Sequence, residues 1–190
     1  MKTGFYKWKR IFLIALLGSF NIEIAIGFTS VKEYIPWTFL AYFIPLAIIE
    51  DLRSRYRWNY KKIFLIGAII GFFVDGIVLK AFFSPFWDNV FGPAHFYDAR
   101  LLNFLSFVPF GHGFITYALS FIIADILLPR KSEESWLTRK HYALLVPMLL
   151  VLWSFMFYSI HSVDGNYIPS AVVFFLAPLF VASLIAIHHF

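Results

Sequence analysis

Long apolar runs alternate with short polar gaps along most of this 190-residue chain. Six of the runs approach the roughly 20 residues that an α-helix needs to cross the apolar core of a lipid bilayer. The pattern therefore predicts an all-α, polytopic membrane protein that forms a single domain, residues 1–190. Its transmembrane helices are expected at about residues 11–28, 34–49, 63–83, 101–128, 142–160 and 168–187.

The first run also has the outline of a signal peptide, because it follows basic residues and ends near the small residues Ala25 and Gly27. Asn21 and Glu23 interrupt this run, and such polar residues are unusual in the apolar core of a signal peptide. We therefore expect an uncleaved first helix.

The sixteen Lys and Arg residues fall mostly in alternate gaps between the runs. Three of them, Lys32, Lys80 and Arg100, lie on one side of the predicted membrane. Thirteen lie on the other side, in the N-terminal tail and two loops: Lys2, Lys7, Lys9, Arg10, Arg53, Arg55, Arg57, Lys61, Lys62, Arg130, Lys131, Arg139 and Lys140. Because short loops rich in Lys and Arg stay in the cytoplasm, we expect both termini of this cell-membrane protein to be cytoplasmic.

The composition agrees with a chain surrounded by lipid, since 61% of the residues are hydrophobic and 25 of the 190 are Phe. The net charge of +5 is explained by the basic residues in the gaps between the predicted helices. We therefore expect the lipid bilayer, and no nucleic acid, as a partner. Other membrane subunits or a second copy of the chain remain open as partners. The absence of cysteine excludes disulfides, thiolate catalysis and cysteine-ligated metals.

Two predicted helices carry small or polar residues at every fourth position, and each series contains a carboxylate (Ala15, Ser19, Glu23, Gly27; Gly67, Gly71, Asp75). Such a stripe lets helix backbones approach closely in lipid, so it is expected to face protein. Glu23 and Asp75 each lie 13 residues past a basic residue, which places both at a depth of about 20 Å.

The fourth predicted helix carries His112, Thr116 and Ser120 at the same spacing, and Pro109 with two nearby glycines predicts a kink there. We expect these three residues to face Glu23 and Asp75 across an intramembrane polar site in the outer half of the bundle. Two interpretations stay open. The carboxylates are protonated or bonded to neighbours and only fix packing, or they share a proton, a metal or a cationic substrate.

Other charged residues lie near the cytoplasmic ends of the predicted helices. Glu50 and Asp51 stand beside Arg53 and Arg55, which indicates a solvated charge cluster. Asp125 is expected to pair with Arg130 or Lys131, the nearest basic residues along the chain.

The segment from Gly67 to Trp87 resembles a stretch in a group of uncharacterised archaeal and bacterial polytopic membrane proteins. The resemblance rests on spaced glycines, an acidic residue before Gly, a Lys and an F-F-x-P-x-W motif, found here as Gly67, Gly71, Asp75, Gly76, Lys80, Phe82, Phe83, Pro85 and Trp87. A downstream histidine matches His112. The resemblance covers about a third of the chain and implies no activity.

Two further families share parts of their motifs with this chain. Intramembrane proteases of the CPBP type carry E-E-x-x-x-R and F-x-x-x-H, but here residue 74 is Val and Phe107 is misspaced from His112. The membrane C subunit of copper monooxygenases carries D-x-x-F-x-P-x-H, found here as Asp88, Phe91, Pro93 and His95. Its upstream histidine is replaced by Leu79, so a copper site would lose a ligand.

The sequence predicts a small transporter, a membrane substrate-binding component or an accessory subunit of a membrane complex, without robust enzyme chemistry. The alternative is a membrane-embedded hydrolase or metalloenzyme that uses the same carboxylates and histidine. Candidate metal ligands for that alternative are Asp75, His95 and His112. No cofactor is strongly implied.

Overall fold

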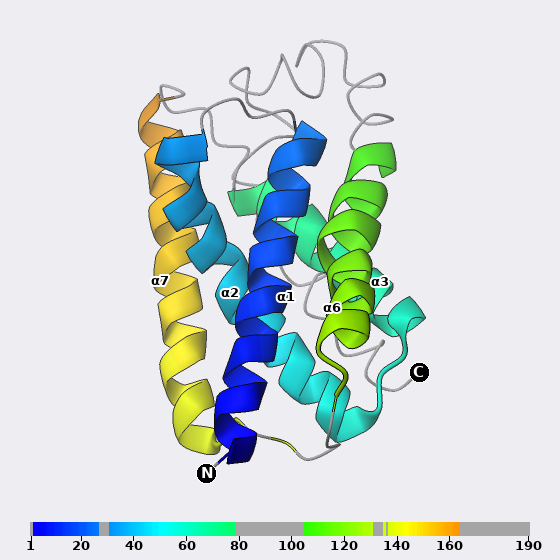
Figure 1. Ribbon diagram of the computed structural model, residues 1–190. Coiled ribbons are helices and arrows are strands. Elements are labelled where there is room, and N and C mark those ends of the chain that lie inside the picture. The colour runs from blue at the N-terminus through cyan, green and yellow to red at the C-terminus, as the bar shows by residue number, and fades with distance from the viewer. Residues whose placement is uncertain (1, 27–30, 79–104, 131–134, 136, 164–190) are drawn as a thin grey trace.

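The computed structural model describes residues 2–26, 31–78, 105–130, 135 and 137–163, and their regular structure is entirely helical (Figure 1). The elements are α1 (Lys2–Ile26), α2 (Val31–Tyr56), α3 (Tyr60–Phe73), the π-helix η1 (Val74–Val78), the π-helix η3 (Val108–Leu119), α6 (Ser120–Leu127) and α7 (Arg139–Val163). The all-α prediction is thus confirmed for this part of the chain. The predicted helix at 168–187 lies outside the described residues.

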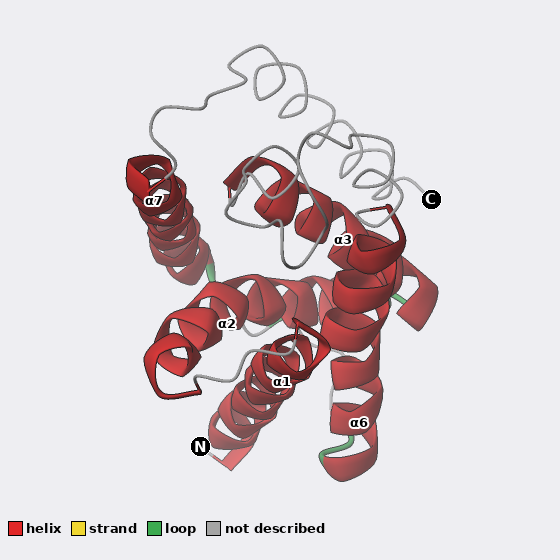
Figure 2. Cartoon of the chain, turned by 90° about the horizontal axis from the view of Figure 1, so that it is seen from above, coloured by secondary structure: helices red, strands yellow, loops and turns green. Residues whose placement is uncertain are grey.

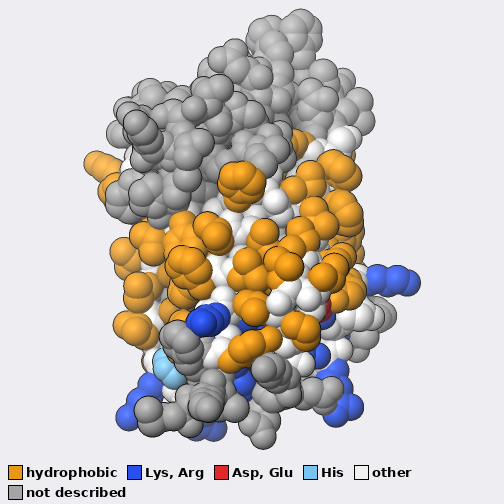
Figure 3. Space-filling model, viewed as in Figure 1, with side chains coloured by type: hydrophobic (Ala, Val, Ile, Leu, Met, Phe, Trp, Pro, Cys, Tyr) orange, Lys and Arg blue, Asp and Glu red, His pale blue; other side chains and the backbone are white. Residues whose placement is uncertain are grey.

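Along the chain, α1, α2, α3 with η1, η3 with α6, and α7 alternate in direction within one bundle (Figure 1). The N-terminus, the turn between α2 and α3, the end of α6 and the start of α7 therefore lie at the same end, which we call the basal end (residues 6–10, 53–60, 125–130 and 137–142). Lys and Arg side chains gather toward this end of the surface (Figure 3). The three most basic segments of the sequence are therefore neighbours in space.

The turn between α2 and α3 explains why both helices differ from the predicted ranges. α2 continues seven residues past Ile49 and ends at Tyr56, after which Arg57 adopts a positive φ of 53°. The Trp58 amide then donates to the Arg53 carbonyl at 3.2 Å. The Asn59 side chain accepts from the Lys62 amide at 3.0 Å, which caps α3 and starts it at Tyr60 rather than at Ile63.

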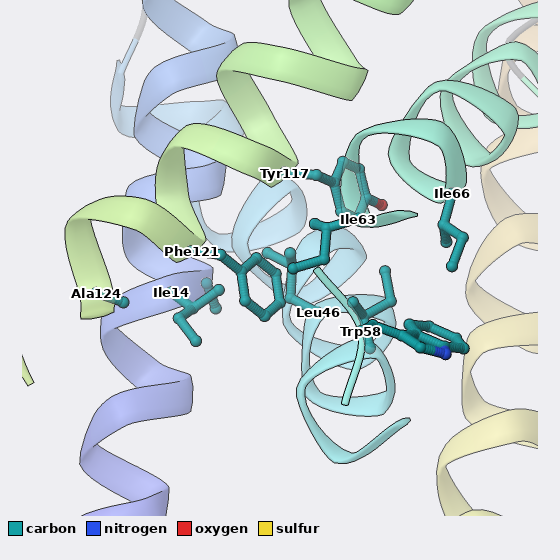
Figure 4. Close-up of a cluster of buried hydrophobic side chains, with 10 residues drawn as sticks. Ile14, Leu46, Trp58, Ile63, Ile66, Tyr117, Phe121 and Ala124 are labelled. Atoms are coloured by element: carbon teal, nitrogen blue, oxygen red, sulfur yellow. The ribbon is translucent and has the colours of Figure 1, made fainter. Parts of the chain in front are cut away.

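The small-residue stripe of α3 faces protein, because Gly67 and Gly71 are buried against η3. A Cβ at Gly67 would lie 2.6 Å from the Tyr117 ring, and a Cβ at Gly113 would lie 3.0 Å from the Phe64 carbonyl oxygen. Glycine on both helices thus brings the two backbones together. The core beside this contact is apolar, with the Phe121 ring between Ile14 of α1 and Ile63 of α3 (Figure 4).

Glu50, Asp51 and Arg53 near the basal end are buried, so the predicted solvated cluster is wrong. Glu50 is 3% exposed and Asp51 is fully buried. Asp125 pairs with Arg10 and Arg53, which are distant in sequence. Of its two predicted partners, Lys131 lies outside the described residues. Partners of these groups lie on α1, α6 and α7, and Asp51 also pairs with Arg55 of α2 itself.

Two helical stretches in the described chain are long and apolar enough to cross a membrane. Leu105–Leu127 has a mean hydropathy of 1.5 and is 56% buried within the protein, whereas Arg139–Ser159 has a mean hydropathy of 1.8 and is only 6% buried. α7 stands to one side of the other helices when the bundle is seen from above (Figure 2). Its apolar side chains, such as Val151 and Phe155, are therefore exposed.

Candidate functional site

Asp75 and His112 form a buried pair between α3 and η3. The Nε2 atom of His112 lies 2.8 Å from Oδ2 of Asp75, and the two residues are 2% and 5% exposed. With the carboxyl group ionised, Nε2 carries the proton and donates to the carboxylate. The structure thus joins two of the predicted site residues, which lie 37 positions apart in the sequence.

Both members of this pair lie on π-helical turns rather than on α-helix. Asp75 belongs to η1, which continues directly from α3, and His112 belongs to η3, which contains Pro109. Pro109 has no amide hydrogen, so it cannot donate within the helix. The Thr116 hydroxyl donates to the carbonyl of Gly111, five residues earlier, at 3.0 Å. The expected kink is therefore a stretch of wider turns, a form that is frequent at functional sites.

Gly71 allows the α3 backbone to approach His112. A Cβ added at Gly71 would lie 2.6 Å from the His112 Cβ and 2.9 Å from a methyl group of Val108. Real Cβ atoms do not approach so closely, so any larger residue would push η3 away from α3. The glycine four residues before Asp75 therefore helps to set the distance between the carboxylate and the imidazole.

Tyr42 of α2 completes the hydrogen bonding of the imidazole. Its hydroxyl lies 3.3 Å from His112 Nδ1, and the two rings stack with centroids 6.0 Å apart. In the tautomer that donates to Asp75, Nδ1 accepts from the Tyr42 hydroxyl. The imidazole is thus oriented from both sides, by α2 and by η1, which is how a proton-transferring histidine is held in one tautomer.

Tyr117 adds a polar group with no hydrogen-bonding partner among the described residues. Its side chain is fully buried, its ring covers Gly67, and its ring centroid lies 6.4 Å from that of Tyr42. A buried hydroxyl usually has a partner, so this one is open to a bound water or ligand atom. Neither tyrosine was predicted from the sequence as a site residue. A signal existed for Tyr42, because a tyrosine inside an apolar helix needs a partner for its hydroxyl.

The other predicted site residues have different neighbours or lie outside the described part. Ser120 accepts from the Asn21 amide at 3.2 Å, so it joins α6 to α1 and is not shown bonding the Asp75–His112 pair. The backbone of Glu23 belongs to α1, but its side chain is outside the described residues, as is His95. Where side chains are described, no three His, Asp or Glu residues gather closely enough to hold a metal.

The geometry brings a carboxyl group and an imidazole together in a buried, polar site. A carboxylate and an imidazole in contact hold one proton between them and accept or release another as their surroundings change. No family model, curated protein or solved structure matches the chain. The resemblances noted from the sequence therefore remain predictions, and function is argued from the site alone.

Proposed function

We propose that the chain is a six-helix membrane protein with cytoplasmic termini that transports a small solute together with proton exchange at Asp75 and His112. The observation that carries this proposal is the 2.8 Å contact between the two side chains, buried inside apolar helices. A charged side chain at the centre of a bilayer costs about 2.5–3.5 kcal/mol on insertion scales, so such residues mark ion paths and proton relays.

The charge of the pair gives proton binding a structural consequence. With Asp75 ionised and His112 neutral, the pair carries one negative charge in a site of low dielectric constant. One additional proton makes the pair neutral overall, either as an ion pair or with both groups uncharged. Since an uncompensated buried charge is costly, proton loss favours a conformation that admits water or a cationic solute.

The proposed topology is supported by the arrangement of the helices. The elements alternate in direction, and the segments that carry thirteen of the sixteen basic residues meet at the basal end, apart from those outside the described ranges. The positive-inside rule assigns this end to the cytoplasm. The Arg139–Ser159 stretch of α7 has a mean hydropathy of 1.8 and is only 6% buried, which fits a helix that faces lipid.

Infrared difference spectra and proton flux together test the proposal. Purified protein in liposomes is titrated from about pH 4 to pH 10, a range that covers the ordinary carboxyl and imidazole groups and their common shifts. We expect a protonated-carboxyl band that is lost in Asp75→Asn. A pH-sensitive dye inside the liposomes should report faster proton entry with at least one solute of a panel of amines, amino acids, sugars and cations, and Asp75→Asn should abolish that response.

Asp164→Asn serves as the matched control, because Asp164 lies beyond the apolar run of the fifth predicted helix. This variant should keep both the band and the flux. Absence of an Asp75 band at every pH would contradict the proton-carrier role. A band without solute-dependent flux across the panel would contradict the transport role.

A further inference from the structure

Four charged residues near the basal end form a largely buried, neutral cluster that joins three helices. We call it the four-charge cluster (Arg10 of α1, Glu50 and Arg53 of α2, Asp125 of α6). Arg10 donates from Nε to Glu50 Oε1 at 2.6 Å and from Nη2 to Asp125 Oδ1 at 2.5 Å. Arg53 donates from Nη2 to the other oxygen of Asp125 at 2.7 Å. Asp125 is thus held by two arginines at once.

Further contacts tie the cluster to helix ends. Arg10 also donates from Nη1 to the carbonyls of Ala124 and Leu128, at 3.0 and 2.5 Å, and so occupies the carbonyl end of α6. The Tyr60 hydroxyl, at the start of α3, donates to Asp125. Burial and this hydrogen bond to a carboxylate raise the pKa of Tyr60, so its hydroxyl stays protonated. A fourth helix is thereby attached to the cluster.

The two arginines of the cluster stay charged at ordinary pH. Burial alone would lower the pKa of Arg53, but the hydrogen bond to Asp125 and the charges of Asp125 and Glu50 outweigh that effect and raise it. The cluster therefore does not respond to pH through its arginines. It responds to water, because separated charges need hydration in place of their partners.

The cluster is not needed merely to hold the helices together. Buried ion pairs contribute little net stability, since desolvation offsets most of their attraction, and apolar side chains of similar size often pack as well. Glu50 Oε2 and Arg53 Nη1 are also buried without a hydrogen-bonding partner in the described structure. These two atoms can form hydrogen bonds with water when the helices of the cluster separate at the edge of the membrane.

An apolar layer lies between the candidate site and the cluster at the basal end. On α2, Tyr42 of the site, Leu46 of the core and Glu50 of the cluster follow at four-residue intervals. Phe121 and Asp125 repeat the last step on α6. The site and the cluster are thus separated by two helical turns, about 12 Å, filled by an apolar layer (Ile14, Ala15, Leu46, Ile63 and Phe121) whose members are fully buried.

We propose that the four-charge cluster is the cytoplasmic gate of the transport path, closed in this structure and opened when α1 and α6 separate and water hydrates the charges. The inference rests on the proposed function, because it assigns the basal end to the cytoplasm and a path to the site. The gate has two levels, the charged one at the water boundary and the apolar layer behind it.

Thiol accessibility tests the gate without any substrate. The chain has no cysteine, so Ala15→Cys places a single thiol in the apolar layer, five residues beyond Arg10. Inverted membrane vesicles present the cytoplasmic face to an impermeant maleimide. Relative to the parent carrying Ala15→Cys alone, we expect about a tenfold faster reaction when Arg10→Gln is added and about a threefold faster one when Tyr60→Phe is added, as fits the loss of several hydrogen bonds or of one.

Three matched variants make the result specific. Arg55→Gln removes an ion pair at the same end but outside the cluster, and should leave the rate unchanged. Leu149→Cys places a buried thiol on α7. This thiol should stay unreactive if Arg10→Gln only opens the gate, and should react if Arg10→Gln unfolds the protein. If the protein unfolds, the Tyr60→Phe variant decides the test. Lys61→Cys, exposed at the basal end, should react at once in inverted vesicles.

The outcomes separate the two proposals. Unchanged Ala15→Cys rates with Tyr60→Phe, and with any folded Arg10→Gln, would overturn the gate and leave the Asp75 titration standing. Accelerated rates with no Asp75 titration would support the water barrier and remove the proton carrier. Reaction of Lys61→Cys only from the outer face of intact cells would overturn the orientation on which both depend.

Discussion

Two buried polar regions of this bundle are built in opposite ways. The Asp75–His112 pair has one carboxylate, one imidazole and a tyrosine, and it lies on π-helical turns. The four-charge cluster has two arginines and two carboxylates on α-helices, with charge-assisted hydrogen bonds shared among them. Both regions are largely buried, yet only the pair contains an imidazole, the side chain that ordinarily changes charge near neutral pH.

The difference separates two kinds of response. Gain or loss of one proton changes the net charge of the pair, so its stable conformation depends on proton binding. The cluster keeps its charges and is neutral as a whole, so its state depends on whether water or the partner residue solvates each charge. In a bundle with one region of each kind, proton binding takes place at the pair, and the barrier to water that proton binding controls lies at the cluster.

The largest expected effect comes from making the same substitution in the two regions. Asp125→Asn leaves Arg10 and Arg53 without their shared carboxylate and should cost about 3 kcal/mol of folding stability, the usual loss for one partner of a buried ion pair. Asp75→Asn keeps an oxygen that accepts from His112 and should cost less than about 1 kcal/mol. Thermal unfolding of both variants in detergent measures the contrast. Equal losses would show that the two regions are built alike.

A second variant changes the approach of the helices without changing any polar group. Gly71→Leu places a branched side chain where even a Cβ would lie 2.6 Å from His112, and should cost about 1–3 kcal/mol or more through overpacking. Ile70→Leu, at the half-buried neighbouring position, should cost less than about 1.5 kcal/mol. Unfolding temperatures that fall equally for both variants would contradict the close contact of α3 with η3.

The smallest effect is expected at Tyr42. Tyr42→Phe removes the donor to His112 Nδ1 but keeps the stacked ring, so the stability loss should be about 0.5–1.5 kcal/mol. The nitrogen NMR shifts of a ¹⁵N-labelled imidazole should reveal a less uniform tautomer. The same spectrum should be unchanged in Tyr158→Phe, whose ring is exposed on α7. An unchanged spectrum in Tyr42→Phe would remove this tyrosine from the site.

The sequence predicts the helical class and the buried stripe of α3 because both follow from local spacing. Gly67, Gly71 and Asp75 recur every fourth residue, so one face of the helix carries them all. The start of α3 was also within reach, since Asn59 is a strong N-cap residue. Patterns that lie within a single helix can therefore be predicted from the sequence.

The charge cluster and the π-helical turns could not be predicted in the same way. Glu50 and Arg53 are near neighbours on α2, but their main partners, Arg10 and Asp125, are 40 and 72 positions away. A basic residue that precedes an apolar run looks the same in the sequence whether its side chain faces water or is buried in the bundle. Arg10 is buried in the bundle. The π-helical turns depend on which carbonyl each amide selects, and no residue spacing encodes that choice.

The wide turns of η3 have a mechanical consequence for the whole bundle. His112 lies within the π-helix Val108–Leu119, and Asp125 lies on the α-helix that continues from it. If the amides of η3 bonded to the fourth preceding residue instead of the fifth, each residue would take a larger share of a turn. The α-helix α6, which continues from η3, would then rotate about the helix axis relative to His112. Torsion along one continuous helix would thus link the imidazole to the carboxylate of Asp125, with no hinge or loop between them.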